Sequence, residues 1–232
     1  MKELLTAVCI CACFALAGCS SDDDSTSTSQ DFIIDARNVE NGNAYNSQID
    51  IVKAAANYEE HHTPDGVFYE TYDVIATANY VNGGFMMTLP VKVDDHLLTS
   101  ITSAFRNETI PDGVNVSNPN AKILGINFLF AFKSGNQIGR FEYGYDIDDS
   151  HSTFVWYVYA DRDVSITGSY SYIADDPSST KYSYSYNFSL KKGWNEHCTT
   201  YGYSEEDKES TTSLSNTKPS GLKWSFGFMN NG

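Results

Sequence analysis

Hydrophobic and polar residues alternate with a period of two along most of the chain, and this period predicts β-strands. The alternation is strictest over residues 182–190, where Tyr, Phe and Leu take every second position and Ser or Asn the positions between. Further strands are predicted in segments with the same or a plainly apolar pattern: 32–34, 49–52, 67–81, 85–89, 126–132, 141–145, 154–158, 164–172, 194–203 and 222–228. The fold class that follows is all-β.

Turn residues separate these segments. Asn82-Gly83-Gly84 predicts a hairpin over residues 67–89, and Ser134-Gly135-Asn136 and Asp148-Asp149 predict two further turns. Short strands joined in this way form a meander, which folds as an antiparallel β-sandwich or, alternatively, as an antiparallel β-barrel. We predict the sandwich.

Two segments depart from the strand pattern. Apolar residues at positions 97, 98, 101 and 105, with Asp94 as a capping residue, predict at most one short helix, of no more than about three turns. Residues 204–220 are rich in Glu, Ser and Thr, and this composition predicts a long exposed loop before the last strand.

The N-terminal segment, residues 1–18, carries Lys2 and then runs mostly apolar, which is typical of a signal peptide and too short for a membrane-spanning helix. It leads into Leu16-Ala17-Gly18-Cys19, which resembles the lipobox of bacterial lipoproteins. The resemblance implies cleavage after Gly18 and a covalent lipid on Cys19, with further acylation of its new amino group. Acyl chains contribute roughly 0.8 kcal/mol per buried methylene, so they hold a protein firmly on a membrane.

Residues 19–30 join the lipidated Cys19 to a polar run of Asp, Ser and Thr, a composition typical of a flexible tether. The acidic part, residues 22–24, resembles the export signal of Bacteroidetes lipoproteins, which implies the outer face of the outer membrane. The alternative is a solvated linker without an export role. The remaining residues, 31–232, are predicted to form one β-rich ectodomain.

The charge balance limits the partners. Acidic residues outnumber Lys and Arg by 30 to 15, which gives a net charge of −15. Nucleic-acid binding requires clustered positive charge, so a nucleic-acid partner is not expected. The same charge repels anionic lipid heads, so the membrane is expected to be contacted through the lipid anchor alone.

Cys198 is the one cysteine beyond the predicted tether, which excludes an intramolecular disulfide in the ectodomain. Its neighbour His197 raises the alternative of an activated nucleophile. Adjacent residues of a strand point to opposite faces, however, so a buried and inert thiol is the favoured interpretation.

Metal and catalytic motifs are weak. His61-His62 lies in a predicted turn, and Asp146, Asp148 and Asp149 resemble the start of a calcium loop without its glycine or its distal Glu. We therefore interpret both as solvated turns and expect no cofactor besides the lipid. No nucleotide-binding or serine-hydrolase motif is present, and a carboxylate pair for glycoside hydrolysis cannot be identified from sequence.

Tyrosines gather in two adjacent predicted strands. Tyr170 and Tyr172 share one face, as do Tyr182, Tyr184 and Tyr186, and such aromatic surfaces stack on sugars or extended peptides. These five residues are the candidate ligand platform. The alternative is cross-strand packing within the protein.

The chain as a whole resembles surface lipoproteins of Bacteroidetes with β-rich ectodomains. The resemblance is carried by the lipobox with its Asp run and, more loosely, by residues 84–90, 192–195 and 221–226. It implies no catalytic residue. We expect a non-catalytic, outer-membrane-anchored module that faces the cell exterior and binds glycan or an envelope protein. The alternative is a surface hydrolase that acts on polysaccharide.

Overall fold

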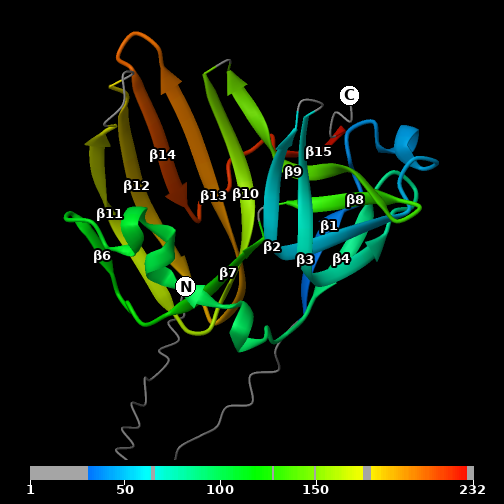
Figure 1. The fold of residues 1–232 in the computed structure, drawn as a ribbon, viewed down its shortest axis with the longest axis horizontal. Coiled ribbons are helices and arrows are strands. Elements are labelled where there is room, and N and C mark those ends of the chain that lie inside the picture. Colours follow the sequence, from blue (N-terminus) through cyan, green and yellow to red (C-terminus); the bar gives the residue numbers. More distant parts are fainter. Residues whose placement is uncertain (1–30, 64–65, 127, 149, 175–178, 229–232) are drawn as a thin grey trace, which may run out of the picture.

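The computed structural model describes residues 31–63, 66–126, 128–148, 150–174 and 179–228, without the side chains of residues 57–72. The described chain is all-β (Figure 1). Its strands are β1 (Phe32–Ala36), β2 (Ile51–Thr63), β3 (Gly66–Asn79), β4 (Phe85–Leu89), β5 (Thr99–Ser100), β6 (Val114–Val116), β7 (Lys122–Ile126), β8 (Leu129–Lys133), β9 (Asn136–Asp148), β10 (His151–Ala160), β11 (Val164–Ile173), β12 (Lys181–Leu190), β13 (Gly193–Ser204), β14 (Glu209–Ser215) and β15 (Lys223–Phe228). The helical segments are all 3₁₀ turns: η1 (Gly42–Tyr45), η2 (Asp95–Leu97), η3 (Ile101–Ala104) and η4 (Arg106–Glu108).

One large sheet runs in the order β3-β2-β8-β9-β10-β13-β14-β12-β11-β6. Strand β15 pairs with β9, β7 pairs with β10 and β5, and β1 and β4 form a separate two-stranded sheet. The long strand β9 joins two lobes, because its first part pairs with β8 and β15 while its last residues pair with β10. The sheet does not close into a barrel, and the predicted sandwich is confirmed.

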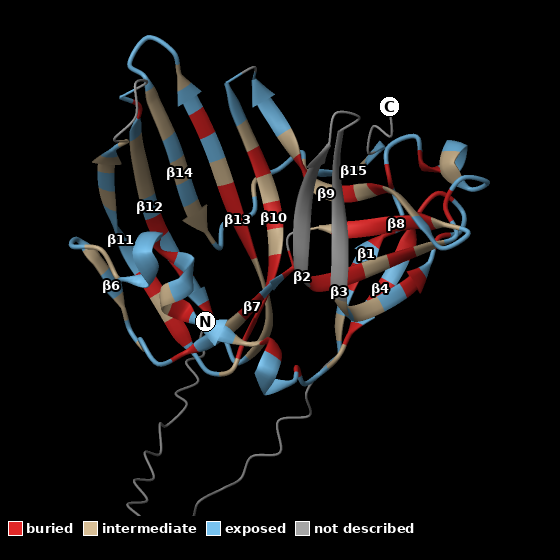
Figure 2. Cartoon of the chain, viewed as in Figure 1, coloured by how far each residue is buried: buried red, intermediate tan, exposed pale blue. Residues whose placement is uncertain are grey.

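The main core lies in the lobe of β1, β4, β8, β9 and β15. Ile34 and Met87 of the small sheet and Phe141 of the large sheet are almost fully buried there. A second cluster fills the space between the β11–β12 pair and the η3–η4 segment, with Ile101, Ile166 and others buried in it. Figure 2 shows buried residues alternating with exposed ones along the strands of both lobes, as period-two patterning requires.

The hairpin predicted over residues 67–89 is wrong. The Asn82–Gly84 turn does form, with hydrogen bonds in both directions between the backbones of Val81 and Gly84. Beyond that turn, however, β3 pairs with β2 and β4 pairs with β1. The apolar residues of β4 therefore complete the small sheet of the sandwich.

The helix predicted from Asp94 to Phe105 is also wrong. The Asp94 side chain makes no capping hydrogen bond, and Leu98 adopts an extended conformation that ends η2 after one turn. Thr99 and Ser100 then pair with β7 before η3 begins. Pairing of Thr99 and Ser100 with β7 therefore overrides the helical spacing of the apolar residues.

None of the described helices is long or apolar enough to cross a membrane.

The loop predicted over residues 204–220 contains a strand. Residues 209–215 form β14, which lies between β13 and β12 and runs parallel to β12. The simple meander is therefore wrong as well, because β14 is inserted between two strands that precede it in the chain. Ser and Thr gave no hydrophobic signal, yet hydrogen bonding on both sides holds them in the sheet.

Candidate ligand-binding groove

Strand β14 forms the floor of a groove. Thr212 has Tyr184 of β12 as its partner on one side and Tyr201 of β13 on the other, and Leu214 lies one step further along the same face. Neighbouring strands lie about 4.8 Å apart, so β12 and β13 are separated by roughly 10 Å. Larger aromatic residues on those strands face each other across the small side chains of β14.

The groove has a volume of ≈ 690 Å³, within the range typical of small-ligand sites. Its aromatic lining consists of Phe128, Trp156, Tyr184, Tyr186, Phe188 and Tyr201. Its hydroxyl groups come from the tyrosines and from Thr99, Ser103, Thr199 and Thr212. No Asp, Glu, Lys or Arg is among the described residues that line it, so the groove is chemically neutral.

The five predicted tyrosines stack together in one array on β11 and β12, and two of them, Tyr184 and Tyr186, line the groove. Tyr170 and Tyr184 have ring centroids 4.9 Å apart and planes inclined by 7°, and Tyr172 and Tyr182 are similarly paired at 5.2 Å and 16°. Tyr186 continues the array, 6.3 Å from Tyr170 and almost parallel to it. Burial raises the pKa of Tyr184, and a hydrogen bond with Tyr172 adds to the shift. Because the rings cover one another, the contribution of the ladder to the groove is limited to Tyr184 and Tyr186.

The η3–η4 segment holds this ladder from one side. Phe105 meets Tyr186 edge-on at 5.5 Å between ring centroids. The guanidinium carbon of Arg106 lies 4.0 Å from the ring centroid of Tyr172, a cation–π contact. Both contacts show that the ladder packs within the protein. Its use as a ligand platform stays a prediction.

The opposite wall is a looser aromatic cluster on β10 and β13, joined by Phe128, which directly precedes β8. Trp156 lies 5.9 Å from Phe128 in an edge-to-face arrangement and 6.0 Å from Phe154 at 42°. Tyr201 is 41% exposed. The interplanar angles of these pairs leave ring faces turned in different directions, unlike the parallel ladder.

Trp156 differs from the other two tryptophans. The indole Nε1 of Trp194 donates to the carbonyl oxygen of Pro90 at 2.8 Å, and that of Trp224 donates to the carbonyl oxygen of Asp35 at 3.0 Å. The indole of Trp156 has no such partner among the described residues. An indole N–H of a half-buried tryptophan usually finds an acceptor, so this donor is available to a ligand.

His197 is the direct cross-strand partner of Trp156 and lines the same groove. The imidazole stacks on Phe188 with centroids 5.4 Å apart and is only 8% exposed. Within the described part of the chain its Nδ1 is enclosed without a hydrogen-bond partner. Burial lowers the pKa of His197 to about 4, so the ring is neutral at neutral pH.

Sequence reasoning missed this pair. Residues 154–158 and 194–203 were predicted as strands, and period two places Trp156 and His197 on defined faces of each. The pairing of β10 with β13 decides whether the two faces meet, and no local signal encodes it.

Cys198 lies on the other face of β13 and outside the groove, as strand geometry requires. The residue is buried among the main core, which confirms that prediction, and burial raises the pKa of its thiol. A thiol in this state is a poor nucleophile.

In the described part of the acidic segment at the end of β9, Asp148 pairs with His151. Nδ1 of His151 lies 2.9 Å from a carboxylate oxygen of Asp148, which lowers the pKa of that carboxyl. Among the described residues no group of three metal-binding side chains is assembled, while Asp149 and the side chains of His61 and His62 lie outside the described part.

A more polar depression of ≈ 650 Å³ lies in the other lobe beside Tyr143 and Trp224. The two rings stack on each other at 4.9 Å and 14°, and the indole N–H of Trp224 is already bonded. The lining of this depression includes the charged residues Asp35, Arg37 and Lys223, unlike that of the β14 groove.

No family model matches the chain, and neither the curated proteins nor the solved structures contain a match.

Proposed function

We propose that the protein is an outer-membrane lipoprotein, anchored through Cys19 and a tether of residues 19–30, whose ectodomain binds neutral glycan in the β14 groove without catalysis. The observation that carries the binding proposal is the lining of the groove, which combines aromatic rings with hydroxyl groups and no charge in the described part.

This lining matches the chemistry of a sugar. Aromatic rings pack against the C–H faces of a pyranose, and short hydroxyl side chains exchange hydrogen bonds with its hydroxyl groups. An acidic glycan would enter against a net charge of −15. A neutral chain meets no such repulsion.

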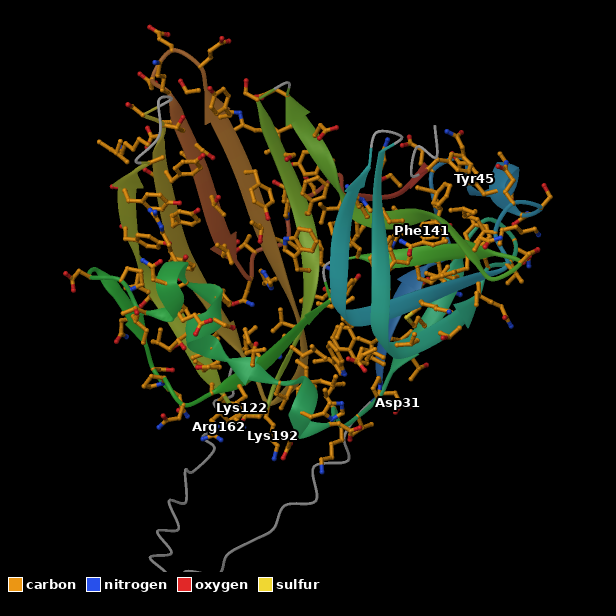
Figure 3. All side chains as sticks on the ribbon, in the orientation of Figure 1. Asp31, Tyr45, Lys122, Phe141, Arg162 and Lys192 are labelled. Atoms are coloured by element: carbon orange, nitrogen blue, oxygen red, sulfur yellow. The ribbon has the colours of Figure 1, made fainter. Side chains whose placement is uncertain are left out.

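The arrangement of the ectodomain is compatible with exposure of the groove. Asp31, where the tether joins, lies at the lower end of the molecule with Lys122, Arg162 and Lys192 (Figure 3). The β13–β14 turn lies at the opposite end (Figure 1). A tether attached at Asp31 would direct this turn away from the membrane.

The anchor is tested by cell fractionation of a Cys19→Ser variant. We expect loss of the chain from the outer-membrane fraction, while a Cys198→Ser control stays there because Cys198 is remote from the lipobox. Protease treatment of intact cells then reports the face. Digestion without lysis supports surface exposure, and protection until the outer membrane is broken contradicts it.

The ligand is tested with the full chain in a detergent that has no sugar headgroup. We expect retardation in affinity gels that contain neutral polysaccharide, and no retardation in gels that contain acidic polysaccharide. Cross-linking to an envelope protein with no glycan retardation would favour a protein ligand. Release of reducing sugar would favour the hydrolase.

A further inference from the structure

We infer that Trp156 and His197 form the anchoring subsite of the groove, in which one saccharide ring stacks on the indole face and accepts a hydrogen bond from the imidazole, while the in-plane indole N–H donates to the adjoining saccharide unit. This inference rests on the proposed function and adds the residues that fix the ligand.

The two residues are placed side by side by strand pairing. Trp156 of β10 and His197 of β13 are direct partners in the antiparallel ladder, and both line the groove. Side chains at such positions start about 5 Å apart, close to the width of a pyranose ring. One sugar unit can therefore contact both residues at once.

The indole supplies the first donor. The N–H groups of Trp194 and Trp224 are used by backbone carbonyl oxygens, whereas the N–H of Trp156 meets no acceptor in the described chain. Trp156 is half-buried, so this donor loses part of its access to water without gaining a protein partner. A ligand oxygen in the groove would satisfy it.

The imidazole supplies the second donor. Nδ1 of His197 is enclosed and, in the described chain, unpartnered, while Nε2 is not enclosed in this way. A buried N–H without a partner is rarer than a buried acceptor without one, so we place the proton of the neutral ring on Nε2. Because His197 lines the groove and Nε2 is its less enclosed nitrogen, we assign the Nε2–H group as the donor to a ligand hydroxyl or ring oxygen.

Aromatic neighbours hold both rings in place. Phe188 stacks on the imidazole at 5.4 Å, and Phe128 packs edge-on against the indole at 5.9 Å. Rings fixed in advance lose little conformational entropy when the ligand arrives. Tyr184 and Tyr186, the ladder residues that line the groove, contribute contacts to the rest of the ligand.

The test is isothermal titration of the purified full chain, in a detergent without a sugar headgroup, with maltohexaose, cellohexaose, mannohexaose and xylohexaose. We expect one or more of these to bind. Trp156→Ala and His197→Phe should each weaken binding at least tenfold, because one removes the stacking surface and the other the donor at nearly constant shape. His96→Gln, at an exposed residue of η2, is the control and should leave the affinity within twofold.

A second readout separates ligand contact from folding. The imidazole ¹⁵N shifts of His197 should move on addition of the sugar that binds, and the moving signal should be that of Nε2. Sugar binding by the wild type that His197→Phe leaves within twofold would overturn the subsite and leave the proposed function standing. Binding of none of the four sugars by the wild type would overturn both.

Discussion

The rings of Tyr170 and Tyr184 lie face to face across β11 and β12, 4.9 Å apart and inclined by only 7°. Each ring therefore covers part of a face that a sugar would otherwise stack on. The same parallel arrangement recurs at Tyr172 and Tyr182. This geometry makes the ladder chiefly a packing element.

Truncation within the ladder should cost stability according to position. Tyr170 lies in the middle of the array, next to Tyr172, Tyr184 and Tyr186, whereas Tyr182 lies at its end beside Tyr172. We expect Tyr170→Ala to lower the free energy of unfolding by about 3 kcal/mol and Tyr182→Ala by clearly less. Urea denaturation of the two variants measures the difference. Equal losses would contradict a continuous ladder.

Replacement of His197 by Phe should stabilise the protein while it weakens ligand binding. The enclosed Nδ1 has no hydrogen-bond partner in the described chain, and an unsatisfied buried polar atom costs about 1–3 kcal/mol. Phenylalanine has a similar shape and can keep the stack on Phe188. We expect a gain of about 1 kcal/mol in the free energy of unfolding, read from urea denaturation. A loss of similar size would show that Nδ1 is satisfied in solution.

The same histidine should make stability depend on pH. Its folded pKa is about 4, below the ordinary value of 6.5, so between these pH values the unfolded chain binds the proton and the folded chain does not. Stability is therefore complete above about pH 6.5 and falls as the pH drops toward 4, by roughly 3 kcal/mol at most.

Denaturation curves from pH 7 to pH 4 check this dependence, with His197→Phe as the control that should lose it. The exposed carboxyls with lowered pKa values, such as Asp50 and Asp148, lose their contribution only as the pH falls below their ordinary value of 3.8 and through their folded values. The loss of stability from these carboxyls therefore occurs at lower pH than the range of about 4 to 6.5 over which His197 acts. An unchanged slope in His197→Phe would assign the dependence to other groups.

The sequence predicted where the strands lie in the chain far better than which strands pair in the sheet. Period two located β12 and the burial of Cys198, because alternation is a local property that the chain shows directly. It missed the separation of β3 from β4, because the turn at Asn82–Gly84 forms equally well when the strands diverge.

Most of the groove could not be predicted from the sequence, because it depends on which strands pair. All five ladder tyrosines were identified, since two adjacent strands of one parity carry them. The floor at Thr212 was assigned to a loop, and the pairing of Trp156 with His197 depends on a contact between strands about 40 residues apart in the chain. Small polar residues carry no hydrophobic pattern, and register between distant strands is set by tertiary packing.

The thiol of Cys198 should resist modification in the folded protein. The residue is 4% exposed, and burial raises its pKa, so little thiolate is present or accessible at neutral pH. We expect reaction with a chromogenic disulfide reagent to be slow in buffer and fast in denaturant. A background in which Cys9, Cys11, Cys13 and Cys19 are all replaced by Ser removes the other thiols of the chain from the measurement. Rapid reaction of the folded chain would contradict the burial.

The edge of the groove sheet should depend on Gly168. Its φ of 111° disfavours any side chain, and a Cβ there would lie 2.0 Å from the carbonyl oxygen of Gly113. Strand β6 pairs with β11 at this point. Gly168→Ala must therefore push the segment that leads into β6 away from β11. Gly193 separates the effect of backbone strain from the effect of the clash. Its φ of 101° is comparable, but no neighbouring atom lies within 4 Å of the position that a Cβ would take there. We expect Gly193→Ala to cost about 1–2 kcal/mol from backbone strain and Gly168→Ala to cost clearly more. Thermal or urea unfolding of both variants measures this difference, and equal costs would mean that β6 yields without loss.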